Sequence, residues 1–226
     1  MTASLRPDHL AAAAVADGVE RLGLALDARQ QQRLLQYAEL LLRWNRIHNL
    51  TAIDRPEQLL THHLLDSLAV APTITARAGG RNMRLLDVGS GGGLPGIPLA
   101  IALPELTVTL VDKVQKKAAF LAQAKLELAL PNVEVVCARI EDVRVAAYDI
   151  IVSRALGALE QLVRWTAPLL APRGCWIAMK GAVPADEIAA LERARPGMYA
   201  MSTVKLHVPG LAAERHVVIL EPIEPQ

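Results

Sequence analysis

From residue 83 onward, short apolar runs alternate with segments of helical character, and this alternation most constrains what the chain can fold into. The apolar runs have the length of β-strands and occupy residues 83–88, 106–112, 133–137, 148–153 and 175–180. The segments between them are predicted to begin helices near Leu94, Val114, Ile140, Leu156 and Pro184. Continuous apolar strands separated by helices indicate a parallel sheet that is covered on both faces. The chain is therefore predicted to be an α/β protein.

Two further apolar runs, later in the chain, are not separated by a helix. Residues 201–208 and 216–222 are joined by a loop that contains Pro209 and Gly210, with no helix between them. Two successive strands of this kind can pair antiparallel. A dinucleotide-binding dehydrogenase continues as an all-parallel sheet, whereas five strand–helix steps and an antiparallel hairpin resemble the class I fold of S-adenosylmethionine-dependent methyltransferases. We expect that Rossmann-like fold, with a mostly parallel seven-stranded sheet.

The first 80 residues lack this alternation and are predicted to be helical. One helix is expected from Asp8 to Leu22, a second from Asp27 to Arg46, and a third from Pro56, with Pro72 and Gly79–Gly80 ending the helical region. The second helix has apolar residues at helical spacing, at Leu34, Leu35, Ala38, Leu41 and Leu42. We expect residues 1–80 to form an N-terminal helical extension of a methyltransferase domain at 81–226.

The first strand ends in a glycine-rich turn, Asp87-Val88-Gly89-Ser90-Gly91-Gly92-Gly93. Glycines here permit positive φ and a close approach of the backbone to a ligand, and the N-terminus of a helix follows. Gly91, Gly93 and Gly96 also fit the G-x-G-x-x-G pattern of dinucleotide sites. A nicotinamide-dependent oxidoreductase is therefore one alternative.

Three features favour S-adenosylmethionine as the cofactor. Asp87 stands two residues before Gly89, and an acid there can hold the cofactor's cationic amino group through water or backbone but would repel a pyrophosphate. Asp112 ends the second strand, where a carboxylate accepts both ribose hydroxyls. The terminal hairpin is the third feature. We therefore expect Asp87, Gly89, Gly91, Gly93 and Asp112 in the cofactor site.

Directly after the glycines stands the block Leu94-Pro95-Gly96-Ile97-Pro98, which is much more specific than the glycines themselves. With other blocks from about residue 35 to 181, it resembles the RsmG (GidB) family of 16S ribosomal RNA guanine-N7 methyltransferases. Further blocks lie at Trp44-Asn45, Asn49-Leu50-Thr51-Ala52, His63-Leu64-Leu65-Asp66-Ser67-Leu68, Lys116-Lys117, Phe120-Leu121, Ser153-Arg154-Ala155 and Lys180-Gly181. At Asp112-Lys113 the chain departs from the Asp-Ser that the family commonly has.

The resemblance implies cofactor contacts at Gly89, Leu94, Ile140, Glu141 and Arg154. Ile140 can cover one face of the adenine ring, and Glu141 can bond the ring edge. Acidic residues are also favoured in the first turn of a helix, and the two interpretations are compatible.

The resemblance also implies attack by guanine N7, whose lone pair requires no base to remove a proton. The chain lacks the signatures of other chemistries. After the fourth strand it has Ser153-Arg154-Ala155-Leu156, where methyltransferases acting on the adenine amine have Asn/Asp-Pro-Pro-aromatic. Cys137 and Cys175 fall in predicted strands, whereas a cytosine-attacking cysteine lies in a loop. No catalytic base is assigned.

Four side chains are candidate positioning groups. Arg154 can pair with the cofactor's methionine carboxylate or an RNA phosphate, or a surface carboxylate can hold it. Lys180 can contact RNA or be a solvated lysine at a strand end. His63 is either a satisfied core residue or a catalytic group, and Asp66 can simply pair with His62 one turn earlier. Adjacent histidines on a helix point in different directions, so no metal site is expected.

Composition sets the remaining expectations. There are 24 basic and 23 acidic residues, and a net charge of +1 neither indicates nor excludes a nucleic-acid partner. The first residues lack the features of a signal peptide, and the following apolar run is too short and too charged to span a membrane. We expect a cytoplasmic monomer without a membrane partner that acts on small-subunit ribosomal RNA or a ribosomal particle. The sequence is also compatible with a methyltransferase acting on another RNA or a small molecule, and with a non-catalytic RNA-binding module.

Overall fold

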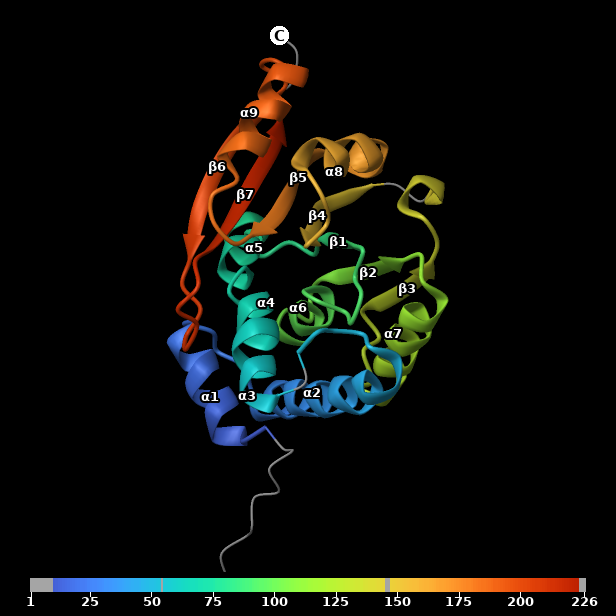
Figure 1. Cartoon of the computed structure of the whole chain (residues 1–226), viewed down its shortest axis with the longest axis vertical. Helices are drawn as coiled ribbons and strands as arrows, with labels where there is room; N and C mark the ends of the chain where they lie inside the picture. The colour runs from blue at the N-terminus through green and yellow to red at the C-terminus, as the bar shows by residue number, and fades with distance from the viewer. Residues whose placement is uncertain (1–9, 54, 145–146, 224–226) are drawn as a thin grey trace, which may run out of the picture.

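The computed structural model describes residues 10–53, 55–144 and 147–223, and these residues build one seven-stranded sheet (Figure 1). The strands are β1 (Arg84–Val88), β2 (Thr107–Asp112), β3 (Val133–Cys137), β4 (Tyr148–Arg154), β5 (Leu170–Lys180), β6 (Tyr199–Leu206) and β7 (Arg215–Pro222). Their order across the sheet is β3-β2-β1-β4-β5-β7-β6. Strands β1 to β5 pair in parallel, and β7 pairs antiparallel with β5 and β6. The predicted methyltransferase fold with its terminal hairpin is confirmed.

Helical segments cover both faces of this sheet (Figure 1). One face carries α1 (Ala12–Arg21), α2 (Ala28–His48), α3 (Pro56–Leu59), the π-helical η1 (Leu60–Leu65), α4 (Asp66–Leu68), α5 (Ala71–Ala78), α6 (Gly96–Ala102) and α7 (Gln115–Glu127). The other carries the 3₁₀ turns η2 (Ile140–Asp142) and η3 (Ala167–Leu169) with α8 (Leu159–Thr166) and α9 (Ala185–Ala194). No helix in the described ranges is both long enough and apolar enough to cross a membrane.

The side chains of the central strands alternate between two hydrophobic cores. Leu85 and Ile150 point into the core beneath α2 and α6, and the adjacent Leu86 and Ile151 point into the core beneath α8. All four are fully buried. Because both faces are covered, consecutive positions within these strands are apolar, which explains the continuous runs in the sequence.

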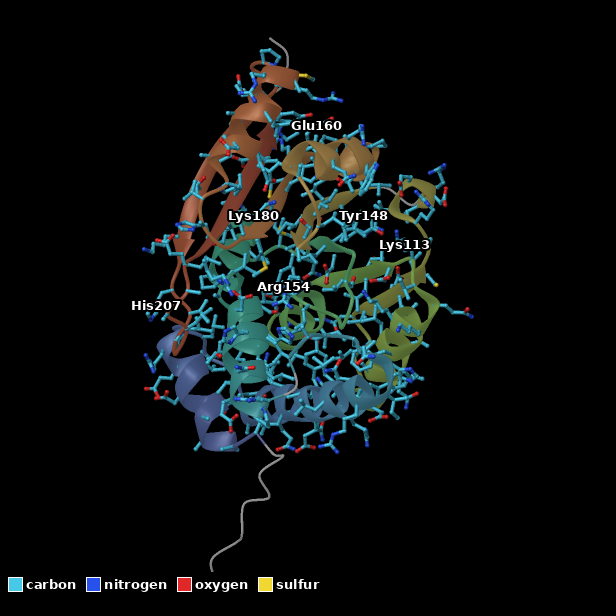
Figure 2. All side chains as sticks on the ribbon, in the orientation of Figure 1. Lys113, Tyr148, Arg154, Glu160, Lys180 and His207 are labelled. Carbon is cyan, nitrogen blue, oxygen red and sulfur yellow. The ribbon has the colours of Figure 1, made fainter. Side chains whose placement is uncertain are left out.

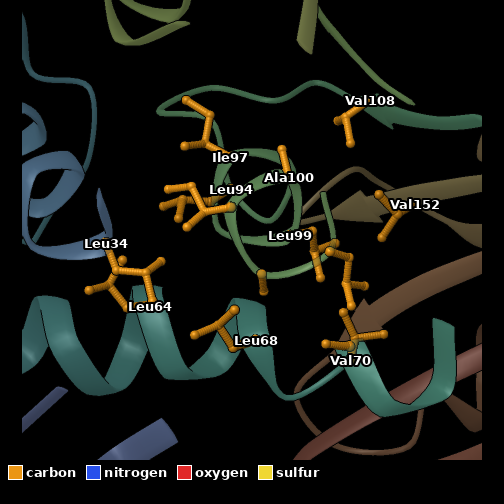
Figure 3. Close-up of a cluster of buried hydrophobic side chains, with 14 of the residues drawn as sticks. Leu34, Leu64, Leu68, Val70, Leu94, Ile97, Leu99, Ala100, Val108 and Val152 are labelled. Carbon is orange, nitrogen blue, oxygen red and sulfur yellow. The ribbon is translucent and has the colours of Figure 1, made fainter. Parts of the chain in front are cut away.

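The N-terminal helices share the first of these cores with the sheet. Leu34 of α2, Leu64 of η1 and Leu68 of α4 pack together with Leu94 and Ile97 of the methyltransferase domain (Figure 3). Each of these side chains is at most 5% exposed. The core therefore runs continuously from residues 10–80, the predicted N-terminal extension, into the rest of the chain.

Helix α2 is fixed at its N-terminus by a capping box. The Asp27 side chain accepts a hydrogen bond from Gln30 N, and the Gln30 side chain accepts one from Asp27 N. Gln30 Nε2 also donates to the carbonyl oxygens of Ile101 and Ala102, at the end of α6. Gln30 thus provides hydrogen-bond partners for backbone groups at the N-terminus of α2 and at the C-terminus of α6, and it fixes α2 against α6.

Several elements differ from those predicted. Helix α5 begins at Ala71 with Pro72 in its first turn, where proline is tolerated, so the helical region runs to Ala78. Only the short η2 follows β3, where a longer helix was expected. Strand β5 starts at Leu170 rather than Cys175. The first helix begins at Ala12 and not near Asp8, which itself lies outside the described residues.

Candidate functional site

The carboxyl ends of β1, β2 and β4 meet at one edge of the sheet, and the glycine loop, residues 89–93, leaves β1 there. The strand order reverses at β1, which is where open α/β sheets bind ligands. Gly89, Gly91 and Gly93 have φ of 71°, 58° and 86°, a region that favours glycine. The loop therefore presents bare backbone to whatever occupies this edge.

Asp112, at the end of β2, holds the glycine loop from one side. Its Oδ2 accepts a hydrogen bond from Gly91 N at 2.9 Å, and its Oδ1 accepts one from Val114 N at 2.8 Å. The residue is 6% exposed and lines the cavity beside the loop. Each carboxylate oxygen has further acceptor capacity, so Asp112 can bind hydroxyl groups while keeping both backbone contacts.

Asp87 lies beneath the loop and is fully buried. Its Oδ2 accepts a hydrogen bond from Gly96 N at 2.9 Å, at the start of α6, and its Oδ1 has no partner among the described residues. Burial raises the pKa of this carboxyl to about 7, although the bond from Gly96 and the charge of Arg154 act in the opposite direction. In this conformation Asp87 holds the backbone of the site and is not itself exposed to a ligand.

Tyr37 of α2 holds the opposite side of the loop, although the sequence pattern does not mark it as part of the site. Its hydroxyl donates to the carbonyl oxygen of Gly92 at 2.5 Å, and the residue is fully buried. Burial raises its pKa well above the ordinary value, so the phenol remains a donor. A Cβ added to Gly92 would lie 3.1 Å from the Leu41 side chain, also on α2. The N-terminal extension therefore forms part of the wall of the loop.

A cavity of about 290 Å³ opens beside the loop between the ends of β1, β2 and β3. It brings together Gly89, Asp112, Ile140 and Glu141, four of the predicted cofactor residues. Ile140 is 8% exposed and presents an apolar surface, while Glu141 Oε1 pairs with Arg139 at 3.2 Å. The cavity thus has a hydroxyl acceptor at one end and an apolar wall at the other.

A smaller cavity of about 160 Å³ continues along the loop. Its lining includes Gly91, Leu94 and Arg154 from the predicted cofactor set, together with Thr51 and His63 from the N-terminal extension. Gly89 lines this cavity and the first one. The two cavities therefore meet at the glycine that follows β1.

A third cavity, of about 470 Å³, lies on the far side of Arg154; we call it the substrate cavity, after the role proposed for it below. Its lining is Ile53, His62, His63, Asp66, Arg154, Ala155, Met179, Lys180, Gly181, Leu206, Arg215 and His216. His63, Arg154 and Ala155 also line the small cavity, so they form the boundary between the two. Figure 2 shows Arg154 near the centre of the molecule and Lys180 at the neighbouring strand β5.

Asp66 accepts hydrogen bonds from two arginines. Arg154 Nη1 donates to Asp66 Oδ2 at 3.0 Å, and Arg215 Nε donates to Asp66 Oδ1 at 2.9 Å. Arg154 Nη1 also lies 3.0 Å from the carbonyl oxygen of His62. Asp66 was a candidate positioning residue, with pairing to His62 as the alternative; the structure shows it joining β4 and β7 to the N-terminal extension instead of pairing with His62. The carboxylate that holds Arg154 is a buried one, with a side chain only 5% exposed.

Both ring nitrogens of His63 have protein partners. Nε2 lies 2.6 Å from Thr51 Oγ1, and Nδ1 lies 2.9 Å from the carbonyl oxygen of His62. Burial, followed by the charge of Arg154, lowers its pKa to about 4. A neutral ring that donates from Nδ1 and accepts at Nε2 satisfies both contacts. This geometry agrees with a satisfied core histidine.

Lys180 is not a solvated strand-end residue. Its Nζ lies 2.8 Å and 3.0 Å from the two carboxylate oxygens of Glu187 and 3.0 Å from the carbonyl oxygen of Gly157. Glu187 also accepts a hydrogen bond from Leu159 N. The lysine therefore links β5, α9 and the start of α8, and its side chain is 16% exposed.

The remaining motif residues have structural positions. Trp44 packs against Phe120, with ring centroids 5.5 Å apart, and against His48. Cys137 and Cys175 lie in β3 and β5, as predicted. Among the described residues there is no cluster of three His, Cys, Asp or Glu side chains suited to a metal ion.

Comparison with known proteins identifies the family. The profile of the GidB family, described as rRNA small subunit methyltransferase G, matches residues 30–218. The chain belongs to the GidB family. Relatives named Ribosomal RNA small subunit methyltransferase G include one from Ralstonia nicotianae, 51% identical over 91% of this chain and 92% of the relative. Another, from Aromatoleum aromaticum, is 49% identical over 94% of this chain and 99% of the relative.

Solved structures show the same fold at low sequence identity. A SAM-dependent methyltransferase from Aquifex aeolicus superposes with a TM-score of 0.56 at 15% identity, covering 77% of this chain and 97% of that one. A Burkholderia thailandensis N1-methyltransferase crystallised with S-adenosylhomocysteine gives 0.55 at 17% identity, over 84% and 90% of the two chains. Membership of the GidB family thus agrees with the fold and removes the dehydrogenase interpretation that Gly91, Gly93 and Gly96 left open.

Four residues of this site in the GidB chain have no marker in the sequence: Tyr37, Glu187, Arg215 and His216. Tyr37 stands among the apolar positions of α2, and nothing in its surroundings marks it as a contact of the glycine loop. Arg215 and His216 belong to the terminal hairpin, more than one hundred residues from the loop. The GidB blocks end before this hairpin, so only the folded structure brings these residues to the site.

Proposed function

We propose that this chain transfers the methyl group of S-adenosylmethionine to N7 of a guanine in 16S ribosomal RNA. The observation that carries the proposal is that three cavities adjoin in a row. The cavity suited to an adenosine meets the small cavity at Gly89, and the small cavity meets the cavity lined by cationic side chains at Arg154 and His63. Family membership supplies the reaction class. We further propose that the protein works as a monomer, because one chain lines all three cavities, and that it acts in the cytoplasm.

The residues of the first two cavities fit the cofactor. Asp112 would accept the ribose hydroxyls, Ile140 would cover the adenine ring, and Glu141 would bond the ring edge. The glycine loop and Leu94 would contact the methionine part through backbone groups, because Gly89 and Gly91 carry no side chain there. When bound, the cofactor supplies an electrophilic methyl group on a sulfonium. Asp87 acts indirectly, through the backbone of Gly96.

The side chains where the small cavity meets the substrate cavity are suited to aligning the base with the methyl group and not to transferring a proton. N7 of guanine already carries a lone pair, so the protein has no proton to remove. His63 is neutral, and both its nitrogens are used within the protein. Holding the base and the methyl group in line supplies much of the rate in such a reaction. Arg154 and Lys180 are fixed by carboxylates, and their proposed role is to position RNA at the boundary of the cavity.

Nucleoside analysis of ribosomal RNA tests the proposal. Small-subunit RNA from a strain that lacks the gene should have lost one 7-methylguanosine, and wild-type protein should restore it. The Asp112→Ala variant should restore it poorly. Loss of a methyladenosine or a methylcytidine instead would show that the substrate assignment is wrong.

A further inference from the structure

The strongest unexplained feature outside the cofactor pocket is the pair of arginines on Asp66. They come from strands β4 and β7, and their common acceptor comes from the N-terminal extension, 88 and 149 residues away in the sequence. The Arg154 and Arg215 side chains are 19% and 22% exposed, and both line the substrate cavity. The arrangement is therefore buried at the carboxylate and open at the guanidinium groups.

Each arginine keeps hydrogen-bond donors that the protein does not use. Arg215 donates from Nε to Asp66 and from Nη1 to the carbonyl oxygen of Glu214. Within the described part of the chain, no hydrogen bond is made by Arg215 Nη2. Arg154 Nη2 has only a 3.5 Å approach to His63 Nδ1, and that nitrogen already donates to the carbonyl oxygen of His62. Both guanidinium groups can therefore bind an acceptor in the cavity.

The charges around the cavity favour an anion. Arg154, Lys180 and Arg215 are the cationic lysine and arginine side chains of the lining. Two carboxylates pair with them, Asp66 with the arginines and Glu187 with the lysine, which leaves one positive charge. A phosphodiester carries one negative charge and presents acceptor oxygens that suit the planar fork of arginine.

Burying the Asp66 carboxylate has a desolvation cost, so stability alone does not explain its position between two arginines. A buried carboxylate between two arginines contributes little stability compared with apolar side chains of the same volume. It does fix two guanidinium groups at a defined separation, because each donates to a different oxygen of one carboxylate. Such fixed geometry is what a binding site for a tetrahedral anion requires.

We propose that Asp66 positions Arg154 and Arg215 as a two-arginine site for one phosphate of the RNA backbone beside the target nucleotide. The inference rests on the proposed function and adds a residue, Arg215, and a ligand group to it. The cofactor's carboxylate is the competing ligand for Arg154, because Arg154 also lines the small cavity beside the glycine loop. Arg215 does not line that cavity, so replacing Arg215 distinguishes binding of an RNA phosphate from binding of the cofactor's carboxylate.

The experiment compares Arg215→Ala with wild-type protein in methyl transfer to unmodified small-subunit RNA or particles, whichever the wild type methylates. We expect the KM for RNA to rise by about tenfold or more, because a charge-assisted contact is lost. The slope of log KM against log salt should decrease by about one. The KM for S-adenosylmethionine and the melting temperature should stay close to wild type. Arg193→Ala, which removes an exposed arginine of α9 outside the cavity lining, is the matched control.

Two further variants separate positioning from simple charge. Arg215→Lys keeps the charge without the fork and should recover only part of the RNA affinity. Asp66→Asn should raise the KM for RNA, and adding Arg215→Ala to it should cause little further loss, because the residues act as a unit. If Asp66→Asn does not fold, Arg215→Ala alone decides the outcome.

The inference fails if Arg215→Ala leaves the KM for RNA and its salt slope unchanged, or if it raises the KM for the cofactor instead. A lower melting temperature with both KM values unchanged would also overturn it, since the ion pairs of Asp66 with Arg154 and Arg215 would then have only a structural role. Each of these results leaves wild-type methylation of RNA intact. Absence of RNA methylation by the wild type is the separate result that would refute the proposed function.

Discussion

The cofactor pocket and the substrate cavity lie side by side, but they are built in different ways. One wall of the pocket is backbone: the glycine loop is one continuous stretch, and Asp112 and Tyr37 hold it by hydrogen bonds to Gly91 N and the Gly92 carbonyl oxygen, respectively. The substrate cavity is mostly side chain, with lining residues from the N-terminal extension, β4, β5 and the terminal hairpin. The backbone wall of the pocket therefore comes from one stretch of sequence, whereas the substrate cavity depends on the whole fold.

The two regions should also respond differently to salt. The Tyr37 contact with the glycine loop and the Asp87 contact with Gly96 are buried hydrogen bonds, and these are little affected by ionic strength. The substrate cavity is bounded by ion pairs that are partly exposed on their cationic side. We therefore expect salt to weaken RNA binding strongly and cofactor binding slightly.

The largest effect is expected from Asp112→Ala, which changes the cofactor pocket and leaves the lining of the substrate cavity intact. Loss of two charge-assisted hydrogen bonds to ribose should weaken S-adenosylmethionine binding by about 3 kcal/mol, or about 100-fold in Kd. Folding should be largely kept, because β2 stays paired on both sides. Calorimetric titration measures the change, and Glu134→Ala on the exposed part of β3 is the control. Unchanged affinity would contradict the ribose assignment.

A smaller effect is expected from Asp87→Asn, beneath the same pocket. The unfolded chain releases this proton near pH 4 and the folded chain near pH 7, so the folded state binds more protons in between. Wild-type stability should therefore fall, relative to the variant, as pH rises through that window. We expect a change of about 2 kcal/mol between pH 5 and pH 8 in the difference between their free energies of unfolding.

Denaturant titrations at the two pH values measure this difference. Asparagine can still accept the hydrogen bond from Gly96 N, so the variant should fold. Glu105→Gln removes an exposed carboxylate and should show little pH-dependent difference. A constant difference between Asp87→Asn and wild type across the range would mean that Asp87 is ionised throughout.

The smallest effect is expected from His63→Gln, at the boundary of the two regions. Glutamine keeps hydrogen-bonding capacity toward Thr51, and the wild-type ring is already neutral above its pKa of about 4. Single-turnover methyl transfer should stay within about threefold of wild type and be nearly flat from pH 6 to pH 9. Arg154→Ala should lose more. A steep pH dependence near neutrality that disappears in His63→Gln would instead make this histidine a catalytic base.

The same contrast explains what could be predicted from the sequence. The strands and the glycine loop were predictable because β1 carries a continuous apolar run into positive-φ glycines, and both signals are local. The boundary of β5 and the shortened segment after β3 were not, since packing decides where such elements begin and end. Lys180 and Asp66 were identified as candidates, but their partners Glu187 and Arg215 depend on contacts between distant segments.

The most direct test of the proposed function is methyl transfer with purified protein, labelled S-adenosylmethionine and small-subunit RNA or particles from a strain lacking the gene. We predict about one labelled methyl group per 16S RNA molecule, recovered after digestion as 7-methylguanosine. We also predict that Asp112→Ala lowers this incorporation at limiting cofactor and that Arg215→Ala lowers it at limiting RNA. Label recovered as another nucleoside, or no incorporation by the wild type with bound cofactor, would contradict the proposed function.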